Sequence, residues 1–266
     1  MKIKSDTLHS LFVGTISSMA LRRRDILSGY WNGAKCVCLS FDCDYEDDMK
    51  ACGPIIELLQ SQEVSTSFAI PGYFAKAFPE VVEEIMKSGH EVLNHTFSHF
   101  PNFRSMSSND VRLEVEGFQE FMMQTYNYLP RGFRTPHGLR KKKPELFEIL
   151  KENGMYDSSI LGYGVTNING MWEIPLTPCP EHPSMAFDSY HHFRFPLVSS
   201  SEKKVLRLWT LMLQKNAFIN IFLDPIDLAD KNRLRLLEQI IGKAKDSGFT
   251  FDQMGRLYEK LNNGGA

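Results

Sequence analysis

The sequence predicts an α/β fold, an irregular barrel of about seven parallel strands surrounded by helices. Apolar strand-like runs and amphipathic helical segments alternate along the chain, as in proteins built from β-then-α units. The 266 residues show no sign of a second core and suit one barrel. Polar side chains follow at least four strands, and a closed ring would bring those strand ends to one face. An open doubly wound sheet is the alternative.

Short apolar runs rich in β-branched and aromatic residues predict the strands. The acidic segment 42–48 follows the first run, and Pro71 and Gly72 end the second. The middle of the chain, 161–198, holds five prolines and one convincing strand, and a long irregular loop of this kind is usually functional. The predicted strands lie at 35–41, 65–70, 90–94, 131–135, 171–176, 217–223 and 248–252, and 156–159 continues the pattern.

Helices are predicted by apolar positions three or four apart and by residues that start or stop a helix. Pro54 stands where a helix can begin, and Pro79 opens another that Gly89 ends. Ser107 or Ser108 caps a long helix whose apolar side chains are interpreted as core. Further helices are predicted at 144–153, 201–215 and 230–246, and 262–266 is interpreted as a frayed tail.

The chain is predicted to have two parts, a leader at 1–35 and a barrel domain at 36–266. Within the leader, the mildly apolar stretch 11–21 precedes the basic cluster 22–24, the reverse of the order in a signal peptide, so a short amphipathic helix is predicted. The alternative is that this helix lies on an anionic membrane surface. No run approaches the eighteen or so apolar residues that a membrane span needs, so the protein is not expected to be integral to a membrane.

The cysteines are expected to be reduced thiols. Cys36, Cys38, Cys43 and Cys52 crowd into one strand and the segment after it, a spacing that does not suit a disulfide framework. A reducing compartment fits best, so the predicted location is cytoplasmic, with peripheral contact at the inner membrane face as an option. The formal net charge is -2 and the basic clusters are short, so nucleic acid is not an expected partner.

A histidine pair is the strongest candidate for chemistry. His95 and His99, four residues apart, would share one face of a helical turn and reach a single cation, although such spacings also occur among ordinary histidines. A catalytic zinc site usually takes three protein ligands, and the best source of the third is the acid pair after the first strand. Asp42 and Asp44 are two apart, so both carboxylates point the same way and Cys43 points the other way.

The acid pair, the histidine pair and the Phe-Arg-Thr-Pro-His-Gly turn at 133–138 occur in that order, each at a strand end. Together they resemble the signature of the polysaccharide deacetylase family, metal-dependent N-deacetylases of the carbohydrate esterase type. The resemblance covers roughly 36–252 and implies a barrel that is often irregular and short of eight strands. It also implies one divalent ion, with zinc expected, and a carbohydrate substrate; it leaves the oligomeric state open.

The resemblance assigns roles to individual residues. It makes Asp42 the general base, and it makes Asp44 a metal ligand together with His95 and His99. In the family the two acids are usually adjacent, whereas here a cysteine separates them, so the assignment within the acid pair is less secure. Arg134 matches the arginine that orients the base through a charge-assisted pair.

The chain departs from the family at its C-terminal motif, where Asp224 stands in place of a histidine before a proline. That histidine is the family's general acid, and an aspartic acid with a pKa near 3.9 would need a rise of about three units to stay protonated at neutral pH. Three explanations remain open. Burial beside Asp42 raises the pKa of Asp224, or His182, His191 or His192 stands in as the acid, or activity is lost.

Four residues are predicted to contact the substrate. Backbone N–H groups near His137 could face a developing oxyanion, and the aromatic residues of the irregular middle segment, Trp172 among them, would suit stacking on sugar faces. His191 and His192 complete the predicted contacts.

Three functions compete. The first is removal of an acetyl group from an N-acetylated sugar, expected to be a cytosolic or lipid-linked precursor of a surface polysaccharide. The second is hydrolysis of another small amide, a ring amide or a formamide. The third is glycan binding by a catalytically impaired relative. The intact acid, histidine pair and arginine argue against the third, because an inactive site has no physical need to keep these buried ionisable groups together.

Overall fold

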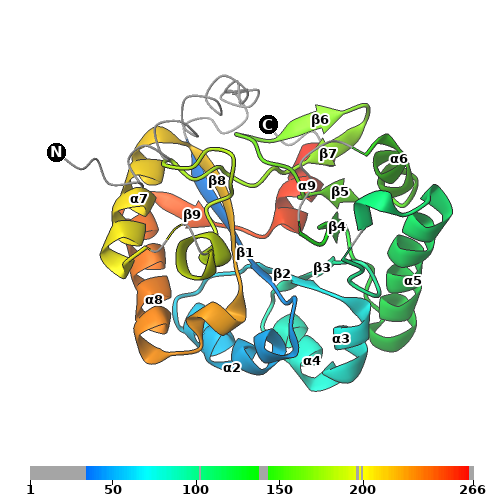
Figure 1. Cartoon of the computed structure of the whole chain (residues 1–266), viewed down its shortest axis with the longest axis horizontal. Helices are drawn as coiled ribbons and strands as arrows, with labels where there is room; N and C mark the ends of the chain where they lie inside the picture. The colour runs from blue at the N-terminus through cyan, green and yellow to red at the C-terminus, as the bar shows by residue number, and fades with distance from the viewer. Residues whose placement is uncertain (1–33, 102, 138–142, 196–197, 199, 264–266) are drawn as a thin grey trace.

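The computed structural model describes residues 34–101, 103–137, 143–195, 198 and 200–263 (Figure 1). The predicted leader lies almost wholly outside the described residues, so its amphipathic helix stays a prediction. Within these described ranges, no helix combines the length and the apolar character that a membrane span requires.

A curled sheet forms the centre of the molecule, and helices pack around its outer side (Figure 1). The strand order is β6-β7-β5-β4-β3-β2-β1-β8, and β9 pairs with β1. The pairings are parallel except for the β6–β7 hairpin, so the α/β barrel prediction is confirmed as a curled, mostly parallel half-barrel. The strands are β1 (Lys35–Asp42), β2 (Ser67–Ile70), β3 (Glu91–Asn94), β4 (Gly132–Phe133), β5 (Tyr156–Asp157), β6 (Thr166–Ile168), β7 (Met171–Glu173), β8 (Phe218–Leu223) and β9 (Phe249–Phe251).

An irregular segment, residues 174–188, spans the gap between β7 and β8. The Thr177 N–H donates to the Asn220 carbonyl at 2.7 Å, and the Asn220 N–H returns a bond to the Thr177 hydroxyl at 2.9 Å. Further on, Asp188 forms a parallel bridge with Phe222 of β8. The prolines of this segment lack the N–H that a regular ladder needs, which explains why isolated bonds replace a strand here.

The helices mostly begin where the sequence predicts. Pro79 and Pro144 occupy first turns, and the Ser107, Ser201 and Asp230 side chains accept hydrogen bonds from the first turns of their helices. The helices are α2 (Glu46–Ser61), α3 (Gly72–Ala77), α4 (Pro79–Lys87), α5 (Ser108–Tyr126), α6 (Pro144–Glu152), α7 (Glu202–Lys215), α8 (Lys231–Asp246) and α9 (Met254–Asn262), with short turns η1 (Phe103–Ser105), η2 (Tyr190–Arg194) and η3 (Pro225–Leu228).

The first helix corrects the prediction. It begins at Glu46, upstream of Pro54, which lies inside the helix. Three acidic residues occupy its first turn, where carboxylates interact favourably with the helix dipole, and the Asp48 carboxylate accepts the Tyr45 N–H at 2.9 Å. These N-terminal interactions offset the backbone hydrogen bond that Pro54 removes. The sequence prediction was wrong because a proline is more common at a helix start than inside one.

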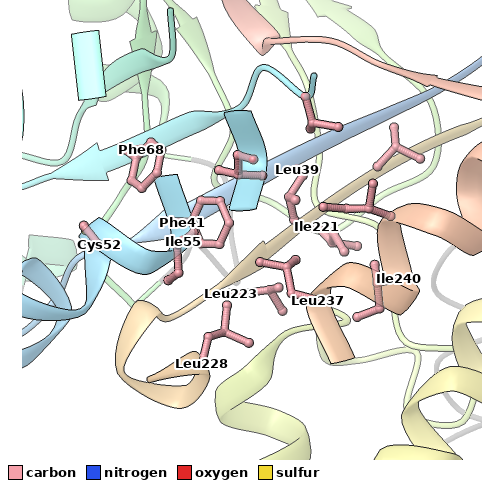
Figure 2. Close-up of a cluster of buried hydrophobic side chains, with 14 of the residues drawn as sticks. Leu39, Phe41, Cys52, Ile55, Phe68, Ile221, Leu223, Leu228, Leu237 and Ile240 are labelled. Atoms are coloured by element: carbon pink, nitrogen blue, oxygen red, sulfur yellow. The ribbon is translucent and has the colours of Figure 1, made fainter. Parts of the chain in front are cut away.

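Strand alternation sends the side chains of β1 into two different core clusters. On β1, Leu39 and Phe41 point outward and pack with β8 and the helices, as Figure 2 shows. Cys36 and Cys38 point into the barrel and pack against α9, which was not predicted. All five cysteines are free and buried, as expected from their spacing.

Helix α9 covers the amino ends of the strands. The Gly255 N–H donates to the Glu91 carboxylate at the start of β3, at 2.9 Å, and the Tyr258 hydroxyl donates to the Gly154 carbonyl just before β5, also at 2.9 Å. One end of the barrel is therefore filled by α9, and the carboxyl ends of the strands are left for a site.

A glycine pair tests the packing of the barrel interior. A Cβ on Gly132 would overlap the Tyr156 ring and lie 2.6 Å from Leu93 Cδ2, whereas a Cβ on Gly117 in α5 meets nothing within 4 Å. We expect Gly132→Ala to lower the free energy of unfolding by about 1–3 kcal/mol, because a packed core accepts added volume only with strain. The control Gly117→Ala should raise it by about 0.5–1 kcal/mol. Urea denaturation followed by circular dichroism measures both, and equal stability of the two variants would contradict the packing described.

Candidate functional site

Three potential metal ligands meet at the carboxyl ends of β1 and β3. Asp44 follows β1, and His95 and His99 follow β3, with only β2 between the two strands. The Asp44 Oδ1 lies 3.0 Å from His95 Nε2 and 3.1 Å from His99 Nε2. The three ligand atoms lie within 4.8 Å of one another, so one ion could contact all of them.

The loop that carries the histidine pair is not a helical turn, which corrects the prediction. Thr96 and His99 adopt left-handed backbone conformations, with φ of 64° and 51°. Side chains hold this loop: the Asn94 amide oxygen accepts the Thr96 N–H at 2.9 Å, and the Thr96 hydroxyl accepts the His99 N–H at 3.1 Å. The two histidines converge because the loop curls back on itself.

The hydrogen bonds at His95 orient it as a ligand. Its Nδ1 lies 2.7 Å from the Arg134 carbonyl, which can only accept, so Nδ1 carries a proton and Nε2 faces Asp44. Burial raises the pKa of Asp44, but the hydrogen bonds from His95 and His99 outweigh burial and hold that pKa well below its ordinary value. Burial lowers the pKa of His95, but its hydrogen bond to Asp44 and the charges of Asp44 and Asp42 together outweigh burial, so the net shift is upward. One carboxylate and two imidazoles are a donor set that suits zinc.

A buried ion pair lies beside these ligands. The Arg134 Nη1 donates to the Asp42 Oδ1 at 2.6 Å, and both side chains are almost fully covered. The guanidinium also donates to the Ser40 hydroxyl at 2.7 Å and to the Ser158 carbonyl at 3.0 Å. Strands β1, β4 and β5 thus hold the arginine in one orientation, and the arginine fixes the Asp42 carboxylate.

Comparison with known proteins agrees with this geometry. Residues 31–156 match the family model described as polysaccharide deacetylase. This match, which spans just under half of the chain, identifies a polysaccharide deacetylase family domain. It is 32% identical over 111 residues to a peptidoglycan-N-acetylglucosamine deacetylase of Bacillus cereus, and the match covers 42% of this chain and 39% of that protein. The chain thus matches less than half the length of this relative.

Solved structures share the fold of this polysaccharide deacetylase domain. One, from Mycobacterium smegmatis and assigned to the polysaccharide deacetylases, has a TM-score of 0.72 at 20% identity and covers 87% of this chain and 91% of that chain. Another is a pseudoenzyme of carbohydrate esterase family 4 from Bacillus anthracis, with a TM-score of 0.59 at 18% identity, covering 85% of this chain and 66% of that chain.

Asp224, at the position where the resemblance predicts a histidine, has an arginine partner that sequence reasoning did not anticipate. It is buried directly after β8, and its carboxylate pairs with the Arg194 guanidinium. Arg194 also donates to the Asp227 carboxylate at 3.0 Å. A cation beside a carboxylate favours the charged form, so this pair opposes the protonation that a general acid at Asp224 would need.

The paired histidines of the irregular segment, which were predicted to contact the substrate, are buried. His191 and His192 are 0% and 1% exposed. Burial lowers the pKa of His191 to about 4 and that of His192 to about 3, so both are neutral at physiological pH. The His191 Nε2 lies 3.0 Å from Nδ1 of His182, which is also buried.

Trp172 is likewise engaged elsewhere. Its indole N–H donates to the Asn262 side chain at the end of α9, at 3.0 Å, and its ring packs on the core cluster that includes α9. Because α9 covers the amino ends of the strands, Trp172 lies toward the end of the barrel opposite the candidate ligands. Its predicted sugar contact stays a prediction, and a half-buried aromatic residue on a strand can serve the core as well as a ligand.

Other rings surround the ligand group. His137 is exposed and its ring centroid lies 5.3 Å from that of His99, so the structure brings this predicted residue to the site. Tyr45 and Tyr73 are also exposed, and burial together with the charge of Asp44 raises the pKa of Tyr73 to about 12. The sequence analysis missed these tyrosines, although Tyr45 directly follows an acid of the motif and Tyr73 follows the end of β2.

Asp188 is a further buried carboxyl that was not predicted. It pairs with Phe222, which faces the Arg134 guanidinium at 5.5 Å, so Asp188 lies on the inner face of the barrel. Its Oδ1 accepts the His191 N–H at 2.6 Å. Burial, and then the charge of Asp42, raises the pKa of Asp188 to about 7. Its local signal is weak, because one acid within an aromatic, histidine-rich segment has no distinctive spacing.

The raised pKa of His95 predicts proton-linked metal binding. A cation must displace the proton that the imidazole holds in the metal-free protein, so we expect zinc affinity to fall as pH falls through this pKa, by up to about tenfold per pH unit. Isothermal titration calorimetry between about pH 7.5 and 6 measures the zinc affinity. The binding step to follow is the one that is absent in the His95→Ala variant. An affinity for that step that stays constant over this range would contradict the assignment.

Proposed function

We propose that the protein is a metal-dependent hydrolase that removes the acetyl group from an N-acetylated sugar. The observation that carries this proposal is the convergence of Asp44, His95 and His99 beside the buried Asp42–Arg134 pair. The name of the relative from Bacillus cereus, which is a sugar deacetylase, supports the same reaction class. We further propose that the substrate is a precursor of a surface polysaccharide; the free, buried cysteines are compatible with a cytosolic or membrane-face location.

The proposed reaction divides the work among these residues. A divalent ion, zinc by its donor set, held by Asp44, His95 and His99 would polarise the amide carbonyl and acidify a water molecule. Asp42 accepts the proton of that water as its oxygen bonds to the acetyl carbon. Arg134 keeps the Asp42 carboxylate in position throughout. The C–N bond then breaks, and acetate and a free amine leave once the amine nitrogen has received a proton.

We propose Asp188 as the donor of that proton. The leaving amine needs an acid on the inner face of the barrel near Asp42, and Asp188 meets this requirement through its bridge to Phe222. Asp224 is less suited, because Arg194 pairs with it and favours its ionised form.

The exposed rings around the ligand group are proposed to bind the sugar. Tyr45 and Tyr73 present aromatic faces beside Asp44, and Tyr190 is 44% exposed on the short turn that also carries Arg194. Sugar rings pack on aromatic faces through their apolar C–H surfaces. His137 stands next to the reacting centre, where it would contact the acetyl group.

Acetate release from N-acetylglucosamine oligomers, nucleotide-linked and lipid-linked N-acetyl sugars, with and without chelator, tests the reaction class. We expect His95→Ala and His99→Ala to lose both metal and activity. Asp42→Asn should keep the metal and lose at least about 10²-fold in turnover, because only the base is removed. The control Asp47→Asn changes an exposed carboxylate of the same segment and should leave turnover unchanged.

Three outcomes would contradict this function. Full metal content in both histidine variants would refute the ligand assignment. Activity confined to ring amides or formamides would favour the alternative hydrolase. A wild type inactive on every amide, together with an active Asp224→His variant, would show that catalysis has been lost and glycan binding retained. The ion pair between Arg194 and Asp224 gives this alternative a physical basis, because it opposes protonation of Asp224.

The role of Asp188 can be tested by comparing two substrates whose leaving groups differ in their need for a proton. An amine must be protonated to leave, whereas the phenolate of an activated aryl acetate leaves without help. We expect Asp188→Asn to reduce N-deacetylation by about 10²-fold or more while aryl ester hydrolysis falls far less. Steady-state rates on both substrates measure the split. A split of this kind in Asp224→Asn, with Asp188→Asn unaffected, would transfer the role to Asp224.

A further inference from the structure

A second group of potential metal ligands lies outside the proposed active site, in the irregular segment between β7 and β8. Cys179, His182 and His191 are buried, and their ligand atoms lie within 4.8 Å of one another. The Cys179 Sγ is 4.0 Å from His182 Nδ1, and that nitrogen is 3.0 Å from His191 Nε2. A fourth residue, His192, brings its Nε2 to 4.0 Å from the same sulfur.

Neighbouring groups orient two of the imidazoles with their Nε2 atoms toward the cluster. The His191 Nδ1 lies 3.0 Å from the Ala186 carbonyl, which can only accept, so Nδ1 carries the proton and the Nε2 lone pair points to His182 within the cluster. The His192 Nδ1 is 3.1 Å from the Ser200 hydroxyl, which leaves its Nε2 facing Cys179. Partners of this kind on the outer nitrogen are the usual arrangement around histidines that bind a metal.

The dimensions suit a tetrahedral ion. Zinc–sulfur and zinc–nitrogen bonds of about 2.3 and 2.0–2.1 Å place sulfur about 3.6 Å from nitrogen, and nitrogen about 3.3 Å from nitrogen. The cluster has separations of 4.0 Å between sulfur and nitrogen and 3.0 Å between the nitrogens of His182 and His191. Each of these three separations differs from its value in a zinc site by less than about half an ångström.

We propose that Cys179, His182, His191 and His192 form a structural zinc site with four protein ligands. One thiolate and three imidazoles are a soft, nitrogen-rich set that selects zinc over magnesium or calcium. The site is closed to solvent, as a structural site is, whereas a catalytic site keeps a position open.

The position of this site gives it a structural task. The segment that holds it is joined to β8 by the Thr177–Asn220 bonds and the Asp188 bridge, where no regular strand completes the ring. An ion bound here would cross-link residues 179–192 and so fix Asp188 and Ser189, whose hydroxyl accepts the Asp224 N–H at 2.7 Å. The zinc would thereby stabilise the part of the barrel wall that carries Asp188 and that contacts Asp224 through Ser189.

Cobalt substitution tests the proposal on the full chain. Protein stripped by chelator and titrated with Co²⁺ should bind two ions per chain and develop a thiolate-to-cobalt charge-transfer band, which the Asp44 site cannot produce because it has no sulfur. Cys179→Ala should lose this band and one equivalent of metal. His95→Ala should lose the other equivalent and keep the band. The control Cys52→Ala, a buried cysteine of α2, should keep both equivalents and the band.

The results also separate this site from the proposed function. In His95→Ala, added zinc should still raise the melting temperature, and Cys179→Ala should abolish that rise. If Cys179→Ala does not fold, the wild-type spectrum and the number of ions bound decide by themselves. A wild type that binds one cobalt ion without a charge-transfer band would overturn the second site and leave the first intact.

Discussion

The buried guanidinium of Arg134 is the constraint on which the candidate site depends. A charge this deep in a protein is tolerated only when it is paired and hydrogen-bonded, and here Asp42, Ser40 and Ser158 satisfy it. The same residue offers its backbone carbonyl to His95 Nδ1, which sets the direction of the ligand nitrogen. The proposed base and one proposed metal ligand are therefore positioned by one residue, and a shift of Arg134 would disturb both.

The least regular part of the chain has an equally specific place. Prolines between β7 and β8 prevent a continuous ladder, and isolated hydrogen bonds with Asn220 and Phe222 replace it. This segment brings Asp188 to the inner face of the barrel and Arg194 to Asp224. Long irregular segments in compact domains are usually functional, and here the segment between β7 and β8 supplies polar groups to the inner face of the barrel.

The two candidate ion sites differ in ways that follow from their surroundings. The group of Asp44, His95 and His99 lies at strand ends, is partly open, and includes a carboxylate. The group of Cys179 and its histidines is closed and includes a thiol. An open site can admit a reactant, and a closed one can only hold chain segments together. The first site lies at the ends of the regular strands β1 and β3. The second lies in the irregular segment that is hydrogen-bonded to β8.

The sequence by itself determined the features that depend on local pattern. Alternation on β1 predicted that Asp42 and Asp44 share a side, and parallel strands predicted that His95 would meet them at the carboxyl ends. Capping residues predicted most helix starts for the same reason, since the interactions involved span only a few residues.

Tertiary structure alone decided which distant groups meet. Asp224 pairs with Arg194, and His191 contacts His182 and the Ala186 carbonyl. Trp172 donates a hydrogen bond to Asn262 at the end of α9. Imidazole, indole and carboxylate groups suit both interiors and surfaces, so their type does not reveal their surroundings. Residue spacing could not predict the left-handed backbone at Thr96 and His99 either. The loop takes its shape from hydrogen bonds that the Asn94 and Thr96 side chains accept, and from the strand that precedes it.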